Sequence, residues 1–155
     1  MLFGFPLSVR ALGEGDRRGV TLGGRTHVAR GGDVEVTVEI TLAHGLNFHG
    51  DVPTLRKVDL IAGSVTGPVS DRDAFRAPAT RVVDTFEVGA AARRSGQFEL
   101  SYRFRNVTEP FYLRLRGSDG NRLTADGSPV MDVVGDADPW ADLWFYANPV
   151  FVDVI

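Results

Sequence analysis

The acidic residues near the end of the chain are the first group whose type and spacing could do chemistry. Asp136, Asp138 and Asp142 stand in the pattern Asp-x-Asp-x-x-x-Asp, and Trp140 lies between them. Carboxylates at alternate positions of a loop ligate Ca²⁺ through their oxygens, but the glycine and glutamate that complete an EF-hand loop are missing here. Aspartate is also an ordinary turn residue. The three aspartates are therefore candidate metal ligands, with a plain acidic turn as the alternative.

Two of the three histidines form a second candidate metal site. His44 and His49 flank a short Gly-Leu-Asn-Phe segment, and Asp51 follows closely. Imidazole and carboxylate groups suit Zn²⁺. The spacing matches neither His-x-His nor the His-Glu-x-x-His pattern of zinc proteases. A polar loop at the rim of the fold is the alternative interpretation.

Aromatic residues gather close to the acidic cluster. Trp140, Trp144 and Tyr146, with Asn148 just beyond, could form an interface or a surface on which sugar rings stack. Aromatic side chains also carry large buried areas in cores. Because the sequence does not separate exposed rings from buried ones, both a ligand surface and core or interdomain packing stay open.

The arginines and serines complete the search for reactive groups. Arg103, Arg105, Arg114 and Arg116 give two predicted strands a basic side, which cross-strand acids or a bound phosphate would balance. No serine stands in a Gly-x-Ser-x-Gly elbow, and the P-loop and Gly-x-Gly-x-x-Gly patterns are absent. The chain thus offers no recognisable catalytic constellation, and whether it is an enzyme stays open.

Composition bounds the class of protein. The 155 residues suit one domain, covering residues 1–155, and the net charge of −3 favours neither a nucleic-acid partner nor a membrane surface. No cysteine is present, which excludes a disulfide framework. No apolar run approaches the ~18 residues of a membrane span. Lys57 is the only lysine beside many arginines, a bias typical of GC-rich bacterial genes. The compartment, cytoplasmic or secreted, stays open.

One segment carries the clearest secondary-structure signal. From Asp33 to Leu42, apolar and polar residues alternate strictly, so that Val34, Val36, Val38, Ile40 and Leu42 share one face. Such alternation predicts a half-buried antiparallel strand.

Shorter versions of this pattern recur along the chain, between glycine and proline turns; Gly63, for example, is expected to end the apolar run that starts at Lys57. The further predicted strands are Leu7–Leu12, Arg18–Leu22, Thr26–Ala29, Lys57–Ile61, Thr80–Val88, Gln97–Phe104, Phe111–Leu115, Leu143–Tyr146 and Val150–Val154. No sustained helical stripe occurs; a single helical turn is expected at Asp71–Phe75. We therefore predict an all-β fold, an antiparallel β-sandwich of about nine strands with an immunoglobulin- or jelly-roll-like architecture.

Three segments resemble a known family. Val58–Gly67, Phe111–Gly117 and Leu143–Val152 are similar to strands of actinobacterial PHP-type (polymerase and histidinol phosphatase) metallo-phosphoesterase-like proteins. In that family a β-rich region follows the catalytic domain and ends in an Arg-x-Arg-Gly strand and an aromatic-x-Asn-Pro-hydrophobic strand. The likeness extends over roughly Leu46–Val154.

The resemblance implies a function for the chain. It implies a non-catalytic accessory domain, excised from the C-terminus of a longer metal-dependent phosphoesterase, a hydrolase. The partner would be the upstream PHP-like catalytic domain or another subunit, a homo-oligomer included. The divalent metal would lie in the upstream domain, with no cofactor in this chain, because no His-x-His pair is present here.

One further expectation follows from this hypothesis. An exposed apolar patch near Phe3, Phe5 or Trp140 would mark the packing surface. A carbohydrate- or calcium-binding β-sandwich module is the alternative, and the substrate of the parent enzyme stays open.

Overall fold

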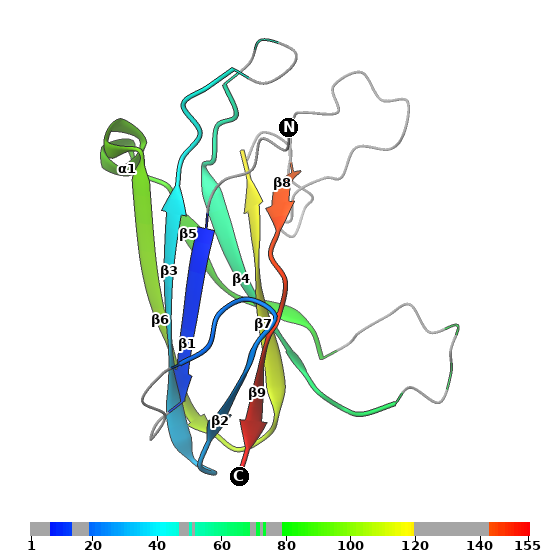
Figure 1. The fold of residues 1–155 in the computed structure, drawn as a ribbon. Helices are drawn as coiled ribbons and strands as arrows, with labels where there is room; N and C mark the ends of the chain where they lie inside the picture. The colour runs from blue at the N-terminus through cyan, green and yellow to red at the C-terminus, as the bar shows by residue number, and fades with distance from the viewer. Residues whose placement is uncertain are drawn as a thin grey trace.

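Two β-sheets pack face to face in the computed structural model of the chain (Figure 1). The structure describes residues 7–13, 19–46, 50, 52–68, 71, 73, 79–119 and 143–155, without the side chains of residues 7–10 and 143–144. The predicted all-β sandwich is confirmed, and nine strands are found in this part of the chain.

The smaller sheet contains the strand with the strongest sequence signal. Its order is β1 (Leu7–Gly13), β3 (Gly32–Thr41) and β6 (Gln97–Val107), all antiparallel. Along β3, the predicted inward residues from Val34 to Ile40 are fully buried. Period-2 alternation therefore identified both the strand and its core face.

The larger sheet has six strands. Its order is β2 (Arg25–Val28), β9 (Val150–Val154), β7 (Phe111–Ser118), β4 (Lys57–Ser64) and β5 (Arg81–Glu87), and β8 (Leu143–Tyr146) also pairs with β7. Ladders between β4, β5, β7, β8 and β9 are antiparallel. The pairing of β2 with β9 is parallel, which corrects the purely antiparallel prediction.

β8 and β9 lie one after the other along the same edge of β7. β8 pairs with the Arg116–Ser118 end of that strand and β9 with the Phe111–Leu113 end. Between them, the Ala147 amide still donates to the Leu115 carbonyl at 2.9 Å. Pro149 follows at the break, where it has no amide hydrogen to give to a ladder. The aromatic-x-Asn-Pro-hydrophobic motif thus forms one interrupted strand.

The core lies between the sheets and is aliphatic. The largest fully buried side chains are Ile40, Leu55, Leu60, Leu113, Leu115, Val28, Val34, Val36, Val38, Val58 and Val88. Burying one such side chain contributes roughly 1.5–3 kcal/mol, so this layer dominates the stability of the fold.

A glycine in β7 makes room for an aromatic ring. Gly117 lies opposite Phe145 of β8, and a Cβ atom at Gly117 would collide with the Phe145 ring and lie 2.8 Å from Leu55 Cδ1. The Arg-x-Arg-Gly motif ends in glycine because β8 packs an aromatic side chain directly over that position.

Three local predictions differ from the structure. Residues Ala90–Ser95 form a short helix, α1, which ends at Gly96 with φ 73°, a left-handed conformation that glycine adopts freely. β4 continues through Gly63, which was expected to end it. The segment around Val20 forms only an isolated bridge to Ala11 rather than a strand, and Asp71–Phe75 lies largely outside the described residues.

Candidate functional site

The outward face of the larger sheet is buried at its centre, which is unusual for an antiparallel sheet. β4 alternates inward residues with Lys57, Asp59 and Ile61 on the outward side, yet Asp59 is only 2% exposed and Ile61 7%. A solvated outer face would leave both exposed. The middle of β4 is therefore packed on both faces.

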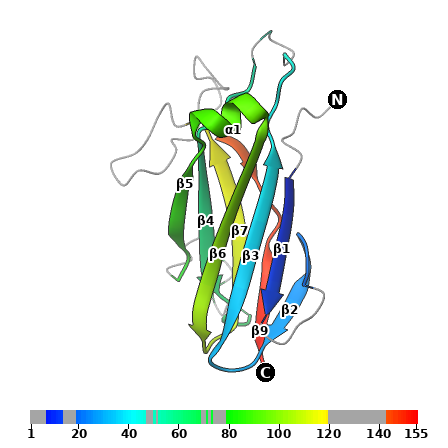
Figure 2. The same cartoon turned by 90° about the vertical axis from the view of Figure 1, so that its left-hand side faces the viewer.

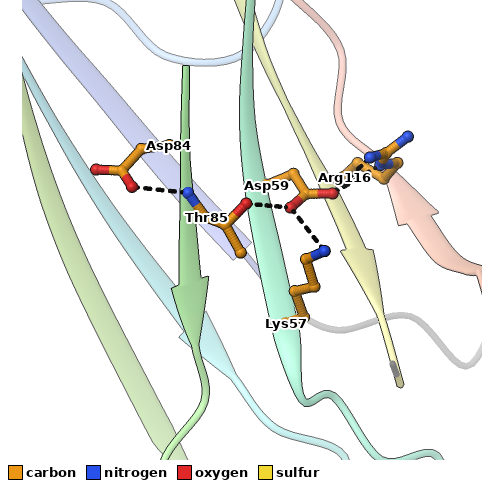
Figure 3. A network of polar contacts seen from close by, with 5 residues as sticks. All are labelled: Lys57, Asp59, Asp84, Thr85 and Arg116. Atoms are coloured by element: carbon orange, nitrogen blue, oxygen red, sulfur yellow. Dashed lines mark hydrogen bonds and ion pairs between the residues drawn. The ribbon is translucent and has the colours of Figure 1, made fainter. Parts of the chain in front are cut away.

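Asp59 is the centre of a polar network (Figure 3). Its Oδ2 atom accepts hydrogen bonds from Arg116 Nε at 2.9 Å and Nη2 at 2.6 Å. Its Oδ1 atom accepts from Thr85 Oγ1 at 2.8 Å and lies 3.7 Å from Lys57 Nζ. Every partner comes from Asp59's own strand or from β5 and β7 on either side of it, so strand register alone brings the groups together.

Burial sets the strength of this network. Side-chain exposure is 11% for Arg116 and 13% for Lys57. Removing one partner of a buried ion pair leaves an uncompensated charge, which costs several kcal/mol. Burial disfavours the charged form of Arg116, but its hydrogen bonds to Asp59 and Tyr146 outweigh this and raise the pKa above its ordinary value. Arg116 is therefore a fixed cation.

Tyr146 joins a second arginine to the network. The Arg114 guanidinium lies over the Tyr146 ring, 4.5 Å from its centroid, while Arg116 hydrogen-bonds the same side chain. A cation over an aromatic face is stabilised by about 0.5–2 kcal/mol. We call Lys57, Asp59, Thr85, Arg114, Arg116 and Tyr146 the β4–β7 charge cluster. It holds three cations and one carboxylate.

In the part of the chain that the structure describes, two buried polar atoms, one in the cluster and one beside it, have no hydrogen-bond partner. They are Arg114 Nε and Ser118 Oγ, both on β7. Ser118 lies opposite Lys57 in the β4–β7 ladder. The cluster therefore has more hydrogen-bond donors and more positive charge than its one carboxylate satisfies.

This arrangement suits stability and surface recognition better than catalysis. Asp59 is already hydrogen-bonded to Arg116 and Thr85, so its lone pairs are not available to take a proton from a substrate. No nucleophile with an adjacent base occurs in the cluster. Tyr146, 43% exposed, presents an aromatic ring of the cluster to a partner or ligand.

Most of the sequence-predicted site residues lie outside the described residues. This holds for Asp136, Asp138, Asp142 and Trp140, and for the side chain of Trp144, so a calcium site or an aromatic platform there stays a prediction. Tyr146 is placed on the outward face of the larger sheet, and Asn148 is exposed in the break between β8 and β9.

The histidine hypothesis is tested only in part. His44 is exposed, whereas His49 and Asp51 lie outside the described residues. His27 lies on β2, with its Nδ1 atom 3.7 Å from Asp153, and thus apart from His44. Within the described ranges, no three histidine or acidic residues come together as a metal site would need.

Two of the four arginines predicted on the basic strands, Arg103 and Arg116, have the acidic cross-strand partners that such pairing predicts. Arg103 pairs with Glu35 and lies 3.8 Å from Asp33, both on β3. Arg116 pairs with Asp59. Asp59 itself was not singled out from the sequence, although a carboxylate inside the apolar run Val58-Asp59-Leu60-Ile61 was a usable signal, because such a charge needs a partner.

Comparison of the chain with protein-family models, with curated proteins and with solved structures found no match. The only helix in the part of the chain that the structure describes, α1, is too short to cross a membrane.

Proposed function

We propose that this chain is a non-catalytic accessory β-sandwich domain that packs against a metal-dependent phosphoesterase domain of the PHP type. The family resemblance of Val58–Gly67, Phe111–Gly117 and Leu143–Val152 is the basis of the proposal. These segments fall on β4, β7, β8 and β9, which are neighbours in one sheet. Their distinctive residues, Gly117 and Arg116 among them, have structural partners, in keeping with an accessory role.

Two exposed apolar side chains carry the packing surface. Leu46 is 60% exposed and Val52 48% exposed, and both lie on the connection between β3 and β4. A hollow of about 230 Å³ is lined by Val52 together with Leu42, His44 and Leu55 among others. We call this end of the sandwich, with residues 42–56 and α1, the loop end.

The loop end is also where β1 begins. Leu7, the first residue of β1, pairs with Ile40 near the end of β3. The connection that carries Leu46 follows directly after β3 (Figure 1). A domain preceding β1 would therefore lie next to Leu46 and Val52. An upstream domain seated there would cover exposed apolar surface of the kind that marks interaction sites. The expected patch at Phe3, Phe5 or Trp140 lies outside the described residues and stays a prediction.

The reading frame upstream of the Met1 codon is the first test. The proposal expects an in-frame domain with His-x-His metal ligands, whose product hydrolyses bis(p-nitrophenyl) phosphate and loses this activity when a chelator removes the metal. A stop codon directly upstream of the Met1 codon would contradict the proposal.

Hydrogen exchange then tests the packing surface. Amides of residues 43–56 should exchange more slowly in the longer protein than in the 155-residue chain. Leu46→Asp together with Val52→Asp should remove this protection. Val65→Asp with Val82→Asp, at exposed apolar residues directly after β4 and on β5, is the matched control and should preserve it. Equal exchange in both proteins would show that the loop end is not the interface.

A further inference from the structure

The two sheets differ in width, and the difference falls on one side of the sandwich. The smaller sheet has three strands, whereas the larger has five strands across. Because strands lie ~4.8 Å apart, about 10 Å of the larger sheet has no strand of the described residues opposite it. β1 lies against β2, so the sheets are aligned at that side, and the uncovered width lies next to β4 and β5, beyond β6 (Figure 2).

A hollow lies beside β6, where a fourth strand of the smaller sheet would cover β4 and β5. It has a volume of about 610 Å³ and is lined by residues of β4, β5, β6 and β7. Its floor is aromatic: the Phe104 ring lies 4.8 Å from that of Tyr102 and 4.7 Å from that of Phe111. Phe104 belongs to β6 and Phe111 to β7, so this contact joins the two sheets below the hollow.

The backbone of β6 has a free edge above this hollow. The Leu42 amide donates to the Gly96 carbonyl at 2.9 Å, and the register continues as Ile40↔Phe98 and Val36↔Tyr102. Hydrogen-bonded pairs alternate with non-bonded pairs in an antiparallel ladder. The amides and carbonyls of Ser101 and Arg103 therefore point away from β3, and no strand in the described part of the chain pairs with them.

The rim of the hollow is positively charged. Three arginines, Arg81, Arg103 and Arg105, line it against one glutamate, Glu109. Arg103 already pairs with Glu35. Among the residues that the structure describes, the side chains of Arg81 and Arg105 make no hydrogen bond or ion pair.

We propose that the free edge of β6 accepts an extended, acidic segment of a partner protein as a fourth strand of the smaller sheet. Strand addition of this kind takes its affinity from main-chain hydrogen bonds and its specificity from alternate side chains. Inward side chains of the added strand would lie over Tyr102 and Phe104 and are therefore apolar. Outward ones would lie beside Arg103 and Arg105 and are therefore acidic.

This inference is independent of the accessory-domain proposal, since it concerns β6 and β5 rather than the loop end. The matching ligand is a segment in which apolar and acidic residues alternate. A fluorescein-labelled ten-residue peptide of alternating valine and glutamate is the probe, and fluorescence anisotropy with the 155-residue chain is the measurement. We expect saturable binding, and at least tenfold weaker binding of the valine–lysine peptide.

Ser101 allows a backbone test that leaves the rest of the sheet in place. Ser101→Pro removes the amide donor at the free edge, and proline is tolerated on edge strands. We expect at least tenfold weaker peptide binding, while Ser101→Ala, which keeps the amide, binds as the unchanged chain does. Arg81→Glu with Arg105→Glu should weaken binding of the valine–glutamate peptide to a similar degree.

A modified peptide tests the proposal on the unchanged chain, so the result does not depend on whether a protein variant folds. The same valine–glutamate peptide, N-methylated at every residue, has no amide donor for a ladder on either of its edges, and it should lose binding to the unchanged chain. Equal affinity for the methylated peptide, or for Ser101→Pro with native circular dichroism, would overturn the proposal. So would a dimer, seen in sedimentation without peptide, that Ser101→Pro converts to monomer, because a second copy would then occupy the edge.

Discussion

The outward faces of the two sheets carry the same kind of ion pair in opposite surroundings. On the smaller sheet, Arg103 pairs with Glu35 across β6 and β3, and the two side chains are 50% and 52% exposed. On the larger sheet, Arg116 pairs with Asp59 across β7 and β4 at 11% and 2% exposure. Both pairs join residues directly opposite each other in an antiparallel ladder.

This difference shows that cross-strand pairing sets the geometry of an ion pair, whereas burial determines the free energy that is lost when the pair is broken. An exposed pair competes with water and salt, and contributes about 0–1 kcal/mol. A buried pair has lost its hydration, so breaking it costs about 3–5 kcal/mol even where its net contribution to folding is small. The outward face of the larger sheet therefore tolerates substitution far less than that of the smaller one.

The largest expected effect is the loss of Asp59. Asp59→Ala leaves the buried Arg116 without its counter-charge, and we expect a loss of about 3–5 kcal/mol in the free energy of unfolding. Urea denaturation followed by circular dichroism measures it. Glu35→Ala is the matched control on the other sheet and should cost no more than about 1 kcal/mol. Equal losses for the two variants would remove the distinction between the faces.

A paired replacement separates the cost of removing one partner of the ion pair from the net contribution of the pair to the free energy of unfolding. Asp59→Leu with Arg116→Met removes both charges and keeps apolar volume at the site. Because buried pairs replaced together by apolar residues are often neutral in stability, we expect the double variant to be more stable than Asp59→Leu alone by at least ~1 kcal/mol. The same denaturation experiment measures the difference. A double variant as unstable as the sum of its single changes would show that the two residues are not coupled.

Tyr146 gives an intermediate effect, because its ring is partly exposed. Tyr146→Ala removes the ring beneath Arg114 and the hydrogen bond to Arg116, and should cost about 1–3 kcal/mol in the free energy of unfolding. Tyr146→Phe keeps the ring and loses only the hydroxyl, so its cost should be about half as large. Thermal melting of the two variants checks the order. Identical melting temperatures for both would exclude a stabilising stack on Arg114.

The smallest effect is expected at the exposed pair. Arg103→Gln should change the free energy of unfolding by less than about 1 kcal/mol, and this change should diminish further in 1 M NaCl, where the screening length falls to about 3 Å. Denaturation at low and high salt measures it. A salt-independent loss of several kcal/mol would place Arg103 with the buried residues instead.

The smaller sheet could be predicted from sequence because its strands alternate. In β3 every second residue is apolar, so both the strand and its inward face follow from the pattern. β4 offered no such signal: six consecutive residues from Val58 to Gly63 are buried, and a run apolar on both faces leaves the end of the strand undefined. The end predicted at Gly63 failed for this reason.

The charge cluster could not be assembled from sequence because it depends on register. Asp59, Thr85 and Arg116 are brought together by ladders between strands that are distant in the chain. Nothing in the spacing of these residues sets which strands are neighbours or how they are aligned. Tyr146 was identified as a surface candidate from its type alone, whereas its contacts with Arg114 and Arg116 required the fold.

The parallel pairing of β2 with β9 has a consequence for the order of folding during synthesis. Arg25 of β2 and Asp153 of β9 are 128 residues apart and lie 2.6 Å from each other at their charged atoms. Of the strands that the structure describes, β9 is the only one that pairs with β2. β2 therefore has no ladder to join until residues 150–154 have left the ribosome. Such non-local contacts slow folding, so β2 stays unpaired until the last strand has been synthesised.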